Sequence, residues 1–175
     1  KNVKGSPFRA ASNIFGTIER SKFIFRKKKK NVQQLIELKE NPIKALKKPF
    51  KNVSIGLAVL NAFPKKNPSV TPVLFQEIKI TDLPQIQHWL MDGGAFITLP
   101  QVYTEDIDRP GIHNANLGMY RIQLSGNDYI LNKEVGLHYQ LHRGIGIHQN
   151  IANKKGLPLK VSVFIGGPPA HSVAA

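Results

Sequence analysis

Two short segments with the two-residue period of β-strands, 116–121 and 138–144, constrain this chain more than any other part of it. Because alternate side chains of an extended segment share a face, His138 and His142 are expected on the same side of the second segment. If the two segments pair as neighbouring strands, the amide of Asn116 and the imidazole of His142 can approach one divalent cation, for which both are plausible ligands. From the residues alone the alternative that Asn116 and His142 bind no metal stays open, because a lone asparagine or histidine on a strand is usually a surface residue.

The same stretch carries groups that suit a phosphate. Arg121 and Arg143 offer guanidinium groups that bind anionic oxygens in pairs. Residues 143–155 are predicted to be helical, which places His142 and Gly144 at the helix N-terminus. Because free N–H groups and the helix dipole favour an anion there, we expect this turn to bind a phosphate.

The remaining pattern predicts short elements separated by turns. Helices are predicted at residues 10–15, 31–39 and 42–48. Strands are predicted at residues 73–80, 95–103, 117–125, 129–131, 135–141 and 159–165. Residues 53–60 fit either a strand or a buried helix. A tight turn is predicted at Asp92, Gly93 and Gly94.

Length and composition exclude several classes of protein. The 175 residues suffice for one or two small domains, and the absence of cysteine excludes disulfides and thiolate chemistry. No GxGxxG, P-loop or GxSxG motif is present, which argues against a Rossmann dehydrogenase, a P-loop NTPase and a serine hydrolase. Apolar runs are too short to cross a bilayer, and the N-terminus lacks a signal-peptide core, so we expect a cytoplasmic protein. The lack of an initiator Met and the end at Ala175, where an apolar segment begins, indicate a piece of a longer polypeptide.

The net charge of +14 raises the alternative of a basic nucleic-acid-binding module. The densest basic run is residues 26–30, and the other lysines are scattered. No zinc-finger spacing or RNA-recognition motif accompanies them. A charge run of this kind is more often a solvated surface than a phosphate-backbone site, so nucleic acid is not the expected partner.

Residues 116–121 and 141–144 together resemble the prenylated-flavin-binding signature of the UbiD family of reversible decarboxylases. The resemblance covers most of the chain in order. Further matches are the N-terminal motif and the segments on either side of the flavin motif, at residues 5–17, 82–84, 92–100, Thr104 and 166–170. Such an ordered series is far more specific than one short motif.

The resemblance implies an α+β fold, with an N-terminal α/β domain over residues 1–110. The start of a split β-barrel flavin-binding domain would occupy residues 111–175. It also implies a carboxy-lyase, namely a reversible non-oxidative decarboxylase of an aromatic or α,β-unsaturated carboxylic acid. A 4-hydroxybenzoate-type acid, with or without a polyprenyl chain, in ubiquinone or menaquinone biosynthesis is the expected substrate class. Prenylated FMN would supply the chemistry, and the protein would supply orientation and electrostatics.

The resemblance also assigns roles to individual residues. Asn116 and His142 match the positions that bind manganese or magnesium beside the flavin phosphate, with potassium as a further candidate ion. Arg121 matches the arginine of the family's catalytic Glu-Arg-Glu network. Contacts to the cofactor are implied for Met119, Tyr120, Arg121, His138, Tyr139, Gln140, His142, Arg143 and Gly144.

The family pattern is incomplete in this segment. The metal-binding glutamate and the catalytic acids are expected beyond residue 175, so the segment alone would lack them. A flavin prenyltransferase is the expected supplier of the cofactor, and the full-length protein is expected to form a homo-oligomer. A non-catalytic flavin- or metal-binding fragment remains a further alternative.

Overall fold

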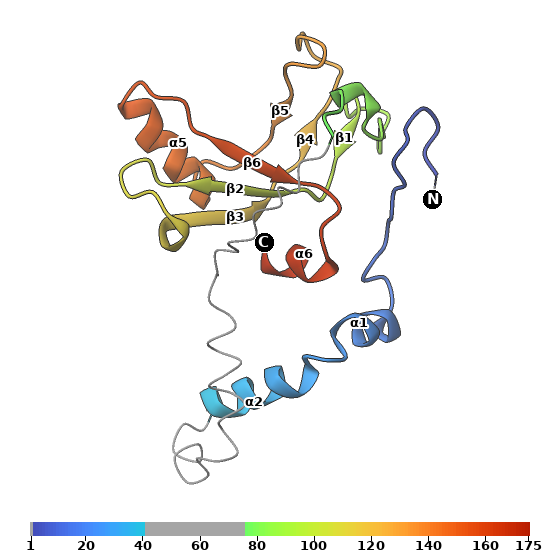
Figure 1. Cartoon of the computed structure of the whole chain (residues 1–175), viewed down its shortest axis with the longest axis vertical. Coiled ribbons are helices and arrows are strands. Elements are labelled where there is room, and N and C mark those ends of the chain that lie inside the picture. Colours follow the sequence, from blue (N-terminus) through green and yellow to red (C-terminus); the bar gives the residue numbers. More distant parts are fainter. Residues whose placement is uncertain (1, 41–75) are drawn as a thin grey trace. The chain divides into compact units, whose positions relative to one another are not determined.

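The structure, a computed structural model, describes residues 2–40 and 76–175 (Figure 1). The chain divides into two compact units, one of residues 1–12 with 74–175 and the other of residues 13–73. The helix predicted at 42–48 and the segment at 53–60 lie outside the described residues. No helix in the part of the chain that the structure describes is long and apolar enough to cross a membrane.

The second unit begins with two helices, α1 (Ile18–Phe25) and α2 (Lys29–Glu40). The prediction of a helix at 10–15 was wrong, because the helix starts only after Thr17, whose side chain accepts a hydrogen bond from the Arg20 N–H at 3.2 Å. Asn13 adopts a φ of 55°, which interrupts any helix through the predicted range. The prediction at 31–39 is confirmed, with α2 starting slightly earlier. The basic residues 26–30 are exposed where α1 gives way to α2.

The first unit contains two antiparallel three-stranded sheets (Figure 1). One has the order β1-β4-β5, and its strands are Phe96–Ile97, Ile122–Gln123 and Gly136–Leu137 respectively. The other has the order β3-β2-β6, and its strands are Ala115–Met119, Gln101–Glu105 and Val161–Phe164 respectively. The α+β class is confirmed. Within the described residues these sheets do not close into a barrel, so the predicted split barrel is not observed as such.

Two predicted long strands are each divided between the sheets. The predicted strand at 95–103 is interrupted at residues 98–100, so that β1 and β2 lie in different sheets. Pro100 lacks an N–H and cannot donate a ladder hydrogen bond at this point. The predicted strand at 117–125 is interrupted at residues 120–121, so that β3 and β4 separate in the same way. Each of these two segments therefore changes sheet, and Arg121 lies at the change between β3 and β4.

The remaining predicted strands had mixed outcomes. The strand predicted at 129–131 was wrong, because this segment turns back on itself and the Ile130 N–H donates to Glu134 at 2.8 Å. The strand predicted at 135–141 shrinks to β5. The strand predicted at 73–80 was wrong for its described part, which leads into a 3₁₀ turn at Ile80–Asp82. The strand predicted at 159–165 is confirmed by β6.

Helices complete the first unit. The predicted helix at 143–155 is confirmed as α5 (Gly144–Lys154), and a short helix, α6 (Pro169–Ala174), follows β6. A 3₁₀ turn at Ile112–Asn114 leads into β3. The predicted domain limit at residue 110 falls between β2 and β3, which pair with each other.

The core of the first unit joins the sheets to α5. Its buried members come from β2, β4, the residue before β1, the residue after β4 and the first turn of α5, namely Ala95, Val102, Ile122, Leu124 and Ile145. Val102 and Ile145 are almost fully enclosed. Burial of these side chains fixes the N-terminus of α5 relative to the strands, at about 1.5–3 kcal/mol for each large side chain.

A close backbone contact holds the predicted Asp92–Gly94 turn against the end of β4. Gly126 has a φ of +94°, and a Cβ there would lie 1.4 Å from the Gly93 carbonyl oxygen. A Cβ on Gly94 would lie 2.0 Å from the Ser125 carbonyl oxygen. Only glycine allows the two turns to approach this closely.

We therefore predict that Gly126→Ala destabilises the protein more than Gly156→Ala. Gly156 also has a positive φ, +64°, but open space around it, so its substitution costs only the left-handed backbone strain of about 1–2 kcal/mol. Gly126→Ala adds the clash with Gly93. Thermal and urea unfolding of the two variants measure the difference, and equal losses of stability would contradict the contact.

Candidate cofactor-binding site

A cavity of about 690 Å³ lies where β3 ends and where the chain enters α5. This volume is within the roughly 300–1,000 Å³ typical of small-molecule sites. Its wall is formed by residues 116–121, 138–140 and 143–144, together with Ala175. The two segments that constrain the sequence most therefore meet at one cavity.

Every predicted site residue except His142 lines this cavity. His142 is exposed in the turn before α5. The expected pairing of the two segments as neighbouring strands is not observed, because β3 pairs with β2 and residues 138–143 form no strand. Asn116 and His142 therefore come from a strand and a turn, and only Asn116 is part of the cavity wall.

Asn116 reaches the N-terminus of α5. A Cβ on Gly144 would lie 2.2 Å from the Asn116 side-chain oxygen, so glycine is required for this close approach. The Asn116 amide also donates to the Tyr120 hydroxyl at 3.4 Å. No side chain caps the start of α5, and its first N–H groups have no partner within the helix. This end of the cavity can therefore accept an anionic oxygen.

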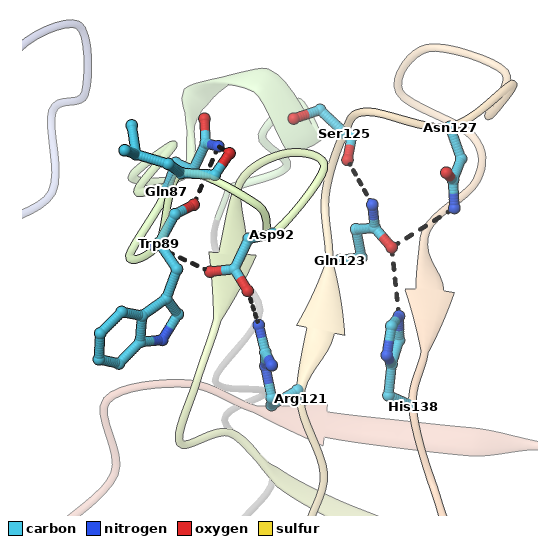
Figure 2. A network of polar contacts seen from close by, with 9 residues as sticks. Gln87, Trp89, Asp92, Arg121, Gln123, Ser125, Asn127 and His138 are labelled. Atoms are coloured by element: carbon cyan, nitrogen blue, oxygen red, sulfur yellow. Dashed lines mark hydrogen bonds and ion pairs between the residues drawn. The ribbon is translucent and has the colours of Figure 1, made fainter.

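Arg121, another residue of the wall, is held by two contacts, of which Figure 2 shows the ion pair with Asp92. Its Nη2 donates to Asp92 Oδ1 at 2.9 Å, and its guanidinium carbon lies 4.0 Å from the centre of the Phe96 ring. The Nε atom is buried and has no hydrogen-bond partner among the described residues. The side chain as a whole is 42% exposed, so a ligand in the cavity meets its exposed part and not the buried Nε.

Asp92 is held as a carboxylate. The hydrogen bond from Arg121 lowers the pKa of Asp92 below its ordinary value of 3.8; burial opposes this change, and the Trp89 N–H reinforces it. The Asp92 side chain is 10% exposed. The pair therefore persists as two charges throughout the neutral pH range.

His138 is oriented by a buried glutamine. Gln123 donates from Nε2 to the Ser125 carbonyl at 3.0 Å, which leaves its Oε1 to face His138 Nε2 at 3.2 Å (Figure 2). Because Oε1 can only accept, His138 donates to it from Nε2. The His138 ring also packs edge-on against Phe96, with ring centroids 5.2 Å apart. Phe96 thus supports both Arg121 and His138.

The residues fit a phosphate-bearing cofactor better than they complete a metal site. Two guanidinium groups and a helix N-terminus suit an anion. Within residues 2–40 and 76–175, no group of three or more His, Cys, Asp or Glu residues could hold a metal ion. A divalent cation held by Asn116 and His142 would need further oxygen ligands.

Comparison with known proteins places this sequence in a family. Residues 62–175 match the sequence model of UbiD, described as the 3-octaprenyl-4-hydroxybenzoate carboxy-lyase Rift-related domain. The chain belongs to the UbiD family. The cavity-lining residues 116–121, 138–140 and 143–144 lie within the matched region.

Relatives of this UbiD chain come from several bacteria and an archaeon. A Chlamydia pneumoniae protein, named as a subunit of 4-hydroxybenzoate decarboxylase, is 34% identical over 99% of this chain and 29% of its own length. Uncharacterized proteins of Chlamydia caviae and Archaeoglobus fulgidus are 37% and 31% identical over 96% and 98% of this chain. These alignments cover 28% and 35% of the two relatives, so the chain spans about a third of their length. No solved structure matches the chain.

Sequence reasoning missed three residues of this UbiD site. The sequence marks Asp92 only as a turn residue, although it lies in the 92–100 segment that resembles the family. Phe96 and Gln123 are marked only as strand residues. A glutamine amid apolar strand residues was the available signal for Gln123, because a buried amide needs partners.

We predict that Asp92→Asn lowers stability in a pH-dependent way. A lowered folded-state pKa means that the ion pair stabilises the folded protein above the unfolded carboxyl value, and that this contribution is lost as pH falls through the folded-state pKa. The difference in unfolding free energy between wild type and variant should be constant between about pH 5 and 8 and should vanish well below pH 3.8. Urea unfolding across this range measures it. A difference that grows toward acid pH would contradict the assignment.

Proposed function

We propose that the polypeptide containing this chain is a carboxy-lyase that reversibly decarboxylates an aromatic or α,β-unsaturated carboxylic acid with prenylated FMN. The observation that carries the proposal is the single cavity that gathers Arg121, Arg143 and the N-terminus of α5. Membership of the UbiD family and the name of the Chlamydia pneumoniae relative support the reaction class. They also favour a substrate of the 4-hydroxybenzoate type. This substrate is either the simple acid or a polyprenylated acid of quinone biosynthesis.

Each part of the cavity has a role in this proposal. Arg143 and the α5 N-terminus bind the cofactor phosphate, because both present N–H donors to an anion. Asn116 and His142 contribute ligands to manganese or magnesium, and potassium is a further candidate. Met119, Tyr120, His138, Tyr139 and Gln140 also line the cavity and would contact the cofactor. When bound, prenylated FMN supplies the electron sink for loss of CO₂.

Arg121 binds the substrate carboxylate. Its Nη2 is held by Asp92, and its side chain is 42% exposed on the cavity wall. A guanidinium fixed in this way orients the scissile bond without reorganising during the reaction. We infer that the acids that protonate the product come from the remainder of the longer polypeptide.

Partners follow from this chemistry. The substrate is a small carboxylic acid, a flavin prenyltransferase supplies the cofactor, and the full-length protein is proposed to be a homo-oligomer. Nucleic acid has no part in the proposal.

The experiment is performed on the full-length protein produced together with a flavin prenyltransferase. We predict that it binds a modified flavin, visible in its absorbance spectrum, and releases CO₂ from 4-hydroxybenzoate or a related acid. Protein produced without the prenyltransferase is the control and should not turn over. Flavin binding without release of CO₂ from a panel of aryl and acrylic acids would indicate a carrier instead of a carboxy-lyase.

We predict that Arg121→Ala reduces kcat/KM by about 100-fold or more, because it removes a fixed donor to the reacting carboxylate. Arg109→Ala is the matched control. Arg109 is also in an ion pair, with Asp106 at 3.5 Å, but its side chain is 75% exposed and does not line the cavity. Steady-state kinetics on the cofactor-loaded full-length proteins measure both, and equal activities of the two variants would contradict the role of Arg121.

A further inference from the structure

Arg121 depends on side-chain contacts for its position more than a strand residue normally does. It lies in the interruption between β3 and β4, where the chain leaves one sheet for the other. Its side chain is 42% exposed, so burial alone does not hold it. Phe96 supports the face of the guanidinium, and Asp92 is the group that fixes one end.

Asp92 is itself rigidly placed. Its Oδ2 accepts from the Trp89 N–H at 3.1 Å, and its own N–H donates to the Trp89 carbonyl at 3.1 Å (Figure 2). The next residues pack against the end of β4, where the Ala95 N–H donates to Ser125 Oγ at 3.1 Å and the Leu124 N–H donates to the Ala95 carbonyl at 2.7 Å. Backbone contacts therefore position the Asp92 carboxylate independently of Arg121.

The nitrogen atoms of the Arg121 side chain differ in their contacts. Nη2 is occupied by Asp92, whereas Nε is buried without a partner among the described residues. The carboxylate of Asp92 also balances the charge of the guanidinium. An incoming carboxylate therefore meets a guanidinium that is fixed at one end and partly neutralised.

Partial neutralisation matters for loss of CO₂. As the carboxylate becomes neutral CO₂, its negative charge moves to the rest of the substrate. An arginine without a neighbouring carboxylate would therefore stabilise the bound acid more than the transition state. Only interactions that are stronger in the transition state raise kcat. A carboxylate next to the arginine reduces the excess stabilisation of the bound acid.

We propose that Asp92 is a positioning residue, which orients Arg121 and balances its charge for the substrate carboxylate. This inference rests on the proposed function. It concerns a residue that acts through Arg121 and does not line the cavity.

Asp92→Asn removes the charge and keeps a side chain of the same shape. In the cofactor-loaded full-length protein, kcat for 4-hydroxybenzoate should fall about tenfold through loss of alignment and charge balance, while KM should fall as well. Asp128→Asn is the matched control, because Asp128 is an exposed carboxyl on the neighbouring turn. It should leave both constants unchanged.

A second readout needs no turnover. Full-length protein made without the prenyltransferase is titrated by calorimetry with 4-hydroxybenzoate and, separately, with 4-hydroxybenzyl alcohol. Asp92→Asn should tighten binding of the acid several-fold and leave binding of the alcohol unchanged. In an Arg121→Ala background the same substitution should change the binding of neither compound, because Asp92 acts only through Arg121. The four proteins form a double-mutant cycle, which measures the coupling between the two residues.

Asp92→Glu tests the position of the carboxylate independently of its charge. It also provides a second variant if Asp92→Asn does not fold. It retains the charge but displaces the carboxylate, so kcat should fall while the affinity for the acid stays near that of wild type. Wild-type kcat in both variants would overturn the inference, as would an Asp92→Asn effect that persists without Arg121. If the wild-type protein itself, loaded with flavin, releases no CO₂, the proposed function fails instead.

Discussion

The double change of sheet at residues 98–100 and 120–121 is the constraint on which the rest of the structure depends. Two chain segments leave one sheet and enter the other within a few residues, so each sheet receives one short strand from each segment. A residue at such a change belongs to neither of the two strands that it joins. Arg121 occupies this position, and His138 is brought beside it by the hydrogen bond from its N–H to the Arg121 carbonyl at 3.0 Å.

Glycines make the close approaches that this arrangement needs. Gly144 leaves room for the Asn116 side chain at the start of α5, and Gly94 and Gly126 bring the Asp92 turn against the end of β4. A Cβ at any of these positions would force a backbone or side chain to move. Of these three glycines only Gly144 lines the cavity, and Ile145 next to it anchors α5 in the core.

Local signals explain which elements could be predicted. Helices α2 and α5 and strand β6 follow from periodicity and turn residues within single segments, and these predictions are confirmed. The helix predicted at 10–15 was wrong because the capping geometry of Thr17 decides where the helix starts. The divided strands were missed because period-2 alternation is the same whether a segment stays in one sheet or moves to another.

The sequence by itself determined the family and the α+β class, because both are carried by ordered local motifs, and every predicted site residue except His142 lies on the cavity wall. Only the tertiary structure decided that Asp92 meets Arg121 and that Phe96 supports both Arg121 and His138. It also decided that Asn116 approaches the start of α5 and that its strand does not pair with the His142 segment. The physical reason is that these contacts join residues far apart in the chain, and their distances depend on how two sheets and a helix pack around one core.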